Sequence, residues 1–228
     1  MSKITGNYFC NLGGRAFNGT QEIIQFLLLI NNFNNLKKII VISGINDLFM
    51  FSNNAFLNNF PGPIYNNQFF IKSLKDLGAN FKDKIIRKLK LKKDLHLDKF
   101  PEITLKDIIK RNIEIWSMIA KGLNIKLDFY LSPYVFWAKK NALLSKEEKV
   151  LINNKTEYDR VYEKLNNSYS LVHDEYDNCC KEKLINFYDL NKMLFKFSEK
   201  KEWLFTDRVH LTDLGYKYCA EFISEKSY

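Results

Sequence analysis

The sequence predicts an α/β fold in which a doubly wound, mostly parallel sheet is flanked by helices. Three short runs rich in β-branched and aromatic residues (36–44, 126–133 and 183–190) have the pattern of buried strands, and helical stripes lie between them. Alternating strands and helices favour parallel pairing, because each helix returns the chain to the edge where the previous strand began. In such sheets, reactive side chains gather at the carboxyl ends of the strands.

The first part of the chain is expected to run strand, helix, strand. The stretch NYFCNLG (7–13) is short and apolar and ends in a pair of glycines, which predicts a strand that enters a loop. A helix is expected over 20–33, with Thr20 as its start signal. The run LKKIIVISG (36–44) predicts a strand that is buried on both faces.

The second part is expected to alternate helices and strands. The apolar positions of 105–125 fall on one helical face, with Gly122 near the end of the helix, and the strand 126–133 follows. The stretch 155–180 carries a single aromatic and apolar stripe at helical spacing, which predicts a helix packed on the body of the protein. The strand 183–190 and a last helix at 213–226 complete the pattern.

We expect the 228 residues to form a single domain (1–228) with a basic loop or helical insertion at about 52–104. The net charge is +9, from 35 Lys or Arg and 26 Asp or Glu. Residues 82–94 alone hold seven basic residues against two Asp. Such a run is typical of a solvated helix face. The alternative is contact with an anionic surface or with nucleic acid.

Composition and spacing argue against several classes of protein. No apolar run approaches the roughly 18–20 residues that span a bilayer, and the first residues lack the apolar core of a signal peptide. The four cysteines have no CxxC spacing and two of them are adjacent, which favours reduced thiols and a cytoplasmic protein. No local spacing of ligand residues predicts a metal site.

Three polar segments follow predicted strands, where an α/β sheet places its chemistry. They are NLGGRAFNGTQE (11–22), SGIND (43–47) and FTDRVHLTDLG (205–215). The last contains Asp207-x-x-His210. A carboxylate that orients a histidine is the arrangement by which hydrolases activate a hydroxyl nucleophile. Each segment is a weak signal by itself, and their order along the chain strengthens it.

In these segments the chain resembles the SGNH (GDSL-like) esterases and acyl hydrolases, from residue 8 to about residue 223. The resemblance implies a flavodoxin-like fold, with His210 as general base and Asp207 as its orienting partner. It also implies that Asn46 belongs to the oxyanion hole. The family's oxyanion glycine falls on Ala16, and Gly14 is the other candidate. A backbone N–H of alanine can take this role where the backbone angles suit a residue with a Cβ.

The family's first block, a strand that ends in Gly-Asp-Ser or Gly-x-Ser, has no counterpart in this sequence. It should precede residue 8, where only MSKITGN stands. Ser2 has no strand before it, and Ser43 belongs to the second strand's block. We therefore expect the nucleophilic serine upstream of Met1, in a protein of which this chain is an N-terminally truncated form. An evolved pseudoenzyme is the alternative.

The missing block would also be structural, because the family's first strand lies inside the sheet. Here its place would be between the strands predicted at 8–12 and 37–43. Without it, backbone N–H and C=O groups on both sides would lack partners, and each costs about 1–3 kcal/mol if it is buried.

The expected reaction is hydrolysis of an O-acyl or small acyl ester, with a carbohydrate as one carrier of the acyl group. The partner is therefore a small-molecule or glycan acyl ester, and no cofactor is required. Without its serine the chain as given is expected to be inactive. Two alternatives stay open: acyl transfer to a sugar hydroxyl at the same site, and non-catalytic binding of an anionic partner through residues 82–94.

Overall fold

The computed structural model describes residues 6, 8–14, 17–52, 103–154, 156 and 158–227. Most of the predicted insertion, with its basic run at 82–94, lies outside these residues. So do Ala16 and Ser2. No helix in the described part of the chain is both long enough and apolar enough to cross a membrane.

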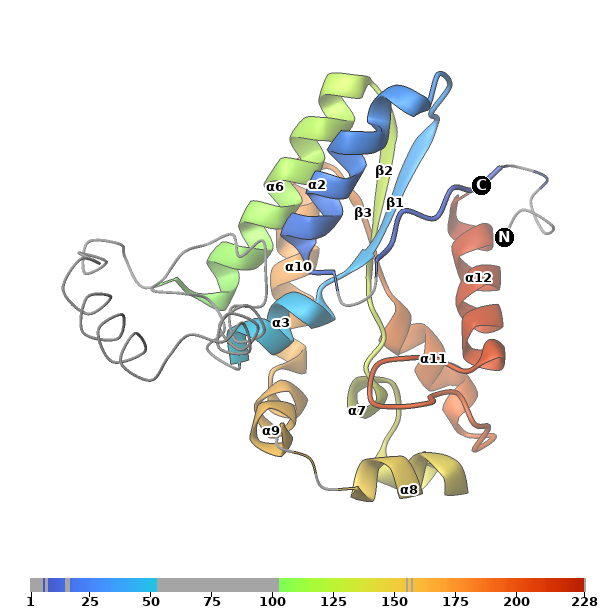
Figure 1. The fold of residues 1–228 in the computed structure, drawn as a ribbon. Helices are drawn as coiled ribbons and strands as arrows, with labels where there is room; N and C mark the ends of the chain where they lie inside the picture. The colour runs from blue at the N-terminus through green and yellow to red at the C-terminus, as the bar shows by residue number, and fades with distance from the viewer. Residues whose placement is uncertain are drawn as a thin grey trace, which may run out of the picture.

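The described sheet has three parallel strands in the order β1-β2-β3 (Figure 1). They are β1 (Lys38–Ser43), β2 (Lys126–Leu131) and β3 (Asn186–Asp189). All three lie within the predicted runs and are flanked by helices, which confirms the α/β fold class. Since the strands are parallel, their carboxyl ends meet at a single edge of the sheet.

Strand β1 is an edge strand among the described residues, and this corrects two expectations. Residues 8–14 form no strand. Within them, the side-chain Oδ1 of Asn11 accepts a hydrogen bond from the N–H of Gly13 at 2.9 Å. The faces of β1 also differ. Val41 is buried, but Ile42 on the other face is 46% exposed. The prediction of a strand buried on both faces was therefore wrong for β1.

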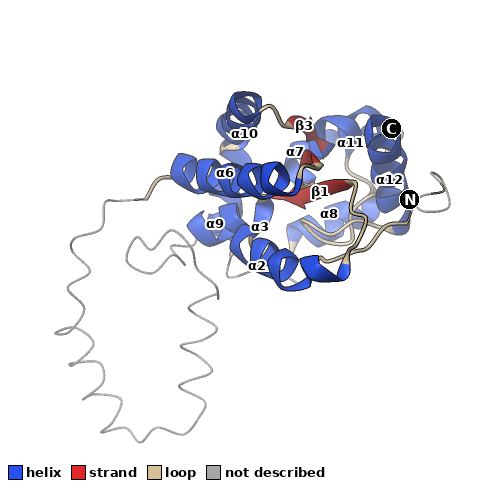
Figure 2. Cartoon of the chain, turned by 90° about the horizontal axis from the view of Figure 1, so that it is seen from above, coloured by secondary structure: helices blue, strands red, loops and turns tan. Residues whose placement is uncertain are grey.

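One face of the sheet is covered by α2 (Gly19–Leu29), α6 (Leu105–Leu123) and α10 (Tyr169–Lys183). Figure 2 shows these helices on one side of the strands. Alternate residues of β1 and β2 point into this layer and join one apolar cluster with the helices, including Val41, Phe129, Ile113, Trp116 and Val172. Their burial is the main favourable contribution to the fold.

Helix α2 begins one residue before Thr20. Its N-cap is Asn18, whose side chain accepts from the N–H of Gln21 at 3.0 Å while the Gln21 side chain accepts from the N–H of Asn18 at 3.1 Å. This reciprocal pair satisfies two backbone groups that the helix leaves free. A single 3₁₀ turn, η1 (Ile30–Asn32), ends the helical segment.

The opposite face carries α11 (Leu190–Ser198) and α12 (Asp213–Ser227). Tyr130 of β2 and Tyr188 of β3 point into this layer, where their rings stack at 4.9 Å between centroids. Helix α12 corresponds to the predicted last helix. Helix α11, which directly follows β3, was not predicted.

Short helices surround the carboxyl ends of the strands. They are α3 (Ile45–Ser52), α7 (Val135–Ala138), η3 (Asn141–Leu143), α8 (Lys146–Asn153) and α9 (Asp159–Asn167). The stripe at 155–180 is divided between α9 and α10 and does not form a single helix. The break is at Ser168, whose N–H and hydroxyl both donate to the carbonyl of Leu165 and close a tight turn. Helix α6 ends at Leu123, so Gly122 lies near its end as predicted, and its C-cap is Asn124, which has φ 52°.

Candidate active site

The residues directly after β2 connect two polar segments at the carboxyl edge of the sheet. Ser132 donates its backbone N–H to the carbonyl of Ser43 at 3.0 Å, which ties it to the turn between β1 and α3. Val135 donates its backbone N–H to the carbonyl of Arg208 at 2.9 Å. The turn that leads into α3 and the loop at 204–212 are therefore held at the same edge, although they are far apart in the sequence.

The loop at 204–212, called here the His210 loop, is closed by its own backbone. Phe205 and Leu211 form an antiparallel bridge. Inside this bridge, the N–H of Thr206 donates to the carbonyl of His210 at 2.9 Å. Phe205 and Leu211 are also buried, so the base of the loop is fixed to the core while its tip lies at the surface.

Asp207 and His210 form a hydrogen-bonded pair at the tip of this loop. One carboxylate oxygen, Oδ2, lies 2.6 Å from His210 Nδ1. The other, Oδ1, accepts from the N–H groups of Val209 at 2.7 Å and of His210 at 2.8 Å. These three hydrogen bonds leave the carboxylate little freedom to turn away from the imidazole.

These contacts determine the charge of Asp207. Partial burial by itself would raise the pKa of the carboxyl group, but the N–H groups of His210 and Val209 and the imidazole outweigh it, so the pKa lies below its usual value. An ionised Asp207 accepts a hydrogen bond from a protonated Nδ1 of His210. In the neutral form of the imidazole, Nε2 then carries no proton and is a hydrogen-bond acceptor. The His210 side chain is 63% exposed, which leaves Nε2 open to a substrate.

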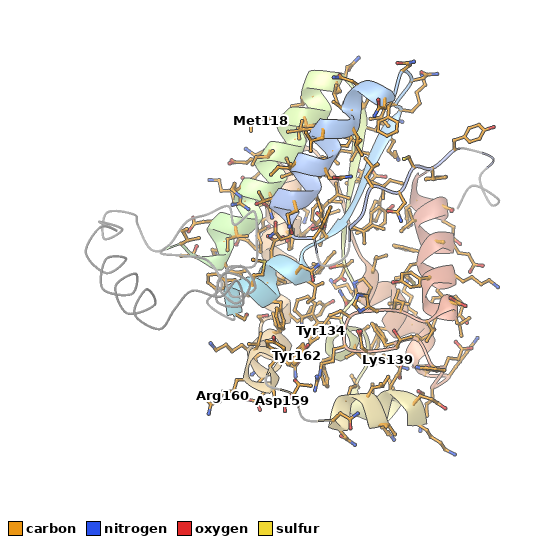
Figure 3. The ribbon with its side chains drawn as sticks, in the orientation of Figure 1. Met118, Tyr134, Lys139, Asp159, Arg160 and Tyr162 are labelled. Carbon is orange, nitrogen blue, oxygen red and sulfur yellow. The ribbon has the colours of Figure 1, made fainter. Side chains whose placement is uncertain are left out.

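A buried ion pair supports the His210 loop from below. Glu148 Oε1 accepts from the backbone N–H groups of Leu204 at 2.9 Å and of Phe205 at 3.1 Å. Its other oxygen lies 2.6 Å from Lys139 Nζ and 2.9 Å from the N–H of Ser145. The side chains of Lys139 and Glu148 are 0% and 1% exposed. In Figure 3, Lys139 lies above α8, the pale yellow helix.

Arg208 supports the other side of the loop. Its guanidinium lies over the ring of Tyr162 at 4.2 Å and donates to Asp159 at 3.2 Å. It also reaches the carbonyls of Ile152 and Asn154, each at 3.3 Å. The side chains of Asp159 and Tyr162 project from α9 in Figure 3. Arg208, which lies between Asp207 and His210, thus attaches this part of the backbone to α8 and α9.

The predicted oxyanion residues lie in the first two polar segments. Asn46 is in the first turn of α3, and its Nδ2 donates to the carbonyl of Phe17 at 2.7 Å. Gly14 lies three residues before Phe17, and its carbonyl accepts a hydrogen bond from the N–H of Phe17 at 3.3 Å. The structure therefore brings Asn46 to the segment that contains Gly14. Ala16 is outside the described residues.

No described hydroxyl or thiol forms a hydrogen bond with Nε2 of His210. Ser43 is the last residue of β1 and Ser132 directly follows β2, so both lie at the carboxyl edge of the sheet. Both are buried, at 7% and 9% exposure. Ser132 Oγ accepts from the N–H of Ile45 at 3.1 Å and so has a structural partner. In the part of the chain that the structure describes, no three His, Cys, Asp or Glu side chains converge as metal ligands.

Sequence reasoning missed the support of the His210 loop. Ser145-x-x-Glu148 has the spacing of a capping box, and Glu148 does cap the start of α8. That spacing could have located the helix. It could not have shown that the same carboxylate also binds Lys139 and the loop, because these contacts exist only after folding.

No protein-family model and no curated protein matches this sequence. A solved structure described as an acetyl xylan esterase, AlAXEase, is similar in architecture, with a TM-score of 0.46 and 14% sequence identity. The match covers 95% of this chain and 79% of that chain. A likeness at this level assigns neither a family nor an activity, and the function has to be argued from the site itself.

Proposed function

We propose that this protein is an ester hydrolase of the SGNH type that acts on an O-acyl or small acyl ester. The observation that carries the proposal is the Asp207–His210 pair. Its 2.6 Å hydrogen bond, its exposed imidazole and its rigid loop suit a general base that takes a proton from a hydroxyl nucleophile. The pair also lies at the carboxyl edge of a parallel sheet, where such groups are expected.

The proposal requires a serine from outside the described residues, and we propose that it comes from a segment upstream of Met1. A strand paired with β1 on the side away from β2, where no described residue pairs with β1, would deliver it to the edge where the His210 loop lies. Asn46 would then complete the oxyanion hole with the N–H of Ala16 or Gly14. The Asn46 amide uses one N–H on Phe17, and its second N–H remains for a substrate oxygen.

The test starts from the native protein, whose N-terminus is established by intact mass. A fluorophosphonate probe should label one serine, which peptide mass spectrometry then locates. Hydrolysis of 4-nitrophenyl acetate should fall by about 10⁴-fold or more in His210→Ala, as it does when a serine hydrolase loses a triad member. Absence of both labelling and turnover in the native protein would reject the enzyme.

Asp207→Asn tests the orienting role separately from the base. We expect a loss on the order of 10⁴-fold in kcat, because the amide favours the wrong tautomer of His210. His173→Ala on α10 is the matched control and should keep its activity, since His173 already binds Lys192 at 2.7 Å and Asp174 at 3.1 Å. Addition of a sugar acceptor distinguishes transfer from hydrolysis, because a transferase releases acylated sugar in place of the free acid.

A further inference from the structure

A concave surface lies at the amino ends of the strands, the edge of the sheet opposite the His210 loop. It encloses about 740 Å³ and is lined by five lysines: Lys38, Lys121, Lys126, Lys183 and Lys226. Two of them begin β1 and β2, and the other three lie in the last turns of α6, α10 and α12. This surface is called here the lysine pocket.

The charge of the lysine pocket is only partly compensated. Lys38 forms an ion pair with Asp128 at 2.8 Å, and Lys183 forms one with Glu114 at 3.0 Å. Among the described residues, no carboxylate lies within ion-pair distance of the other three lysines, and no Asp or Glu lines the pocket. Three of the five lysines that line the hollow therefore have no carboxylate partner in the described part of the chain, although Lys226 Nζ lies 5.9 Å from the centre of the Phe222 ring. A multiply charged anion would supply the missing counter-ion.

The other residues of the pocket indicate what the anion carries. Ser117, Asn124 and Asn186 add uncharged hydrogen-bonding groups, while Ile125 and Ile185 are among the aliphatic side chains of the wall. No aromatic ring lines the described pocket, so it offers no platform on which a nucleobase could stack. Lysine ammonium groups bind phosphate as point charges. The combination suits a phosphate group on an aliphatic or saturated-sugar body.

Helix ends give a simpler reason for some of these lysines. Cations in the last turn of a helix interact favourably with its dipole, which accounts individually for Lys121, Lys183 and Lys226. It does not account for Lys38 and Lys126, which begin strands, nor for the convergence of all five on one concavity. A volume of about 740 Å³ is also within the usual range for small-molecule sites.

We propose that the lysine pocket binds a phosphate ester, either a soluble organic phosphate or the phosphorylated headgroup of a lipid. This binding is separate from the proposed ester hydrolysis, because the two sites lie at opposite edges of the sheet. The basic run at 82–94 lies outside the described residues and is not part of this proposal.

Calorimetric titration of the full chain with inorganic pyrophosphate tests the site. Lys126→Glu combined with Lys226→Glu should weaken binding by about tenfold or more, since two charge-assisted contacts are lost and repulsion is added. The matched control is Lys146→Glu combined with Lys149→Glu, two exposed lysines of α8 that change the net charge equally. The control should bind as the parent does.

Vesicles distinguish the two sources of phosphate. Sedimentation with phosphatidic acid vesicles, but not with phosphatidylcholine vesicles, in addition to pyrophosphate binding would indicate a lipid headgroup. Pyrophosphate binding alone would indicate a soluble phosphate. The inference is overturned if pyrophosphate does not bind, or if the α8 variant loses binding as much as the pocket variant does. Either result would leave Lys121, Lys183 and Lys226 a role at helix ends only. Neither outcome depends on esterase activity.

Discussion

Glu22 of α2 and Asp47 of α3 are two carboxyl groups that lie close together inside the protein. Glu22 Oε2 and Asp47 Oδ1 are buried and have no hydrogen-bond partner among the described residues. The pKa of Glu22 is raised to about 8. Burial is the largest cause of this rise; a hydrogen bond with Ser43 lowers the pKa, and the charge of Asp47 raises it. Burial likewise raises the pKa of Asp47. Glu22 is therefore expected to be protonated at neutral pH.

A raised carboxyl pKa makes the folded state less stable as the pH rises. Between pH 4.5 and about 8 the folded protein holds a proton on Glu22 that the unfolded chain has released. The free energy of unfolding should fall across this window, by roughly 5 kcal/mol at most. Glu22→Gln, which resembles the neutral acid, should flatten this slope. Denaturant unfolding at several pH values measures it.

The control for Glu22 is Glu199→Gln, which changes an exposed glutamate after α11. It should leave the pH dependence as it is in the parent protein. An unchanged slope in Glu22→Gln would mean that Glu22 does not hold the extra proton, and that Asp47 or another group causes the dependence.

At the scale of elements, the His210 loop depends on helix α8 for its position. Glu148 joins the first turn of α8, Lys139 and the backbone of Leu204 and Phe205 in one buried set of hydrogen bonds. Removal of one partner from a buried ion pair leaves the other charge without compensation, which typically costs 3–5 kcal/mol. Lys139→Met should therefore lower the free energy of unfolding by about this amount.

The variant should also disturb the loop before it unfolds the protein. We expect faster amide hydrogen exchange at Leu204 and Phe205 in Lys139→Met, because their acceptor is no longer held in place. Lys149→Met on the exposed face of α8 is the matched control and should change stability by less than about 0.5 kcal/mol. Equal effects of the two substitutions would show that the ion pair does not position the loop.

At the scale of the whole molecule, the described sheet has one central strand, β2, and two edge strands, β1 and β3. Strand β2 lies between two partners, whereas β1 has a partner only on the β2 side among the described residues. Alternate N–H groups of β1 point away from β2 and should exchange with solvent quickly, while those of β2 should be the most protected in the sheet. Hydrogen exchange followed by NMR measures both.

The same experiment bears on the proposed serine strand. If a longer native protein carries that strand, the outward amides of β1 should become protected in it and stay exposed in the present chain. Uniform protection of β1 in the present chain would contradict the prediction and would mean that another segment already covers this edge.

Local pattern predicted all three described strands and the helices α2, α6 and α12. The strands β1, β2 and β3 and the helices α6 and α12 lie where the apolar periodicity placed them, because this signal depends on neighbours a few residues apart. The errors also have local causes. The N-cap of α2 is Asn18 and not Thr20, the stripe at 155–180 breaks at Ser168, and a turn replaces the strand predicted at 7–13.

The sequence alone was sufficient to predict a parallel α/β sheet and the pairing of Asp207 with His210. A spacing of three residues lets these two side chains meet within one turn. Tertiary structure alone decided what holds that pair. Glu148 lies 56 residues before Leu204 and binds it only after α8 packs under the loop. The five lysines of the lysine pocket come from five elements in the same way. Contacts between distant segments depend on how whole elements pack, and no short stretch of sequence carries that information.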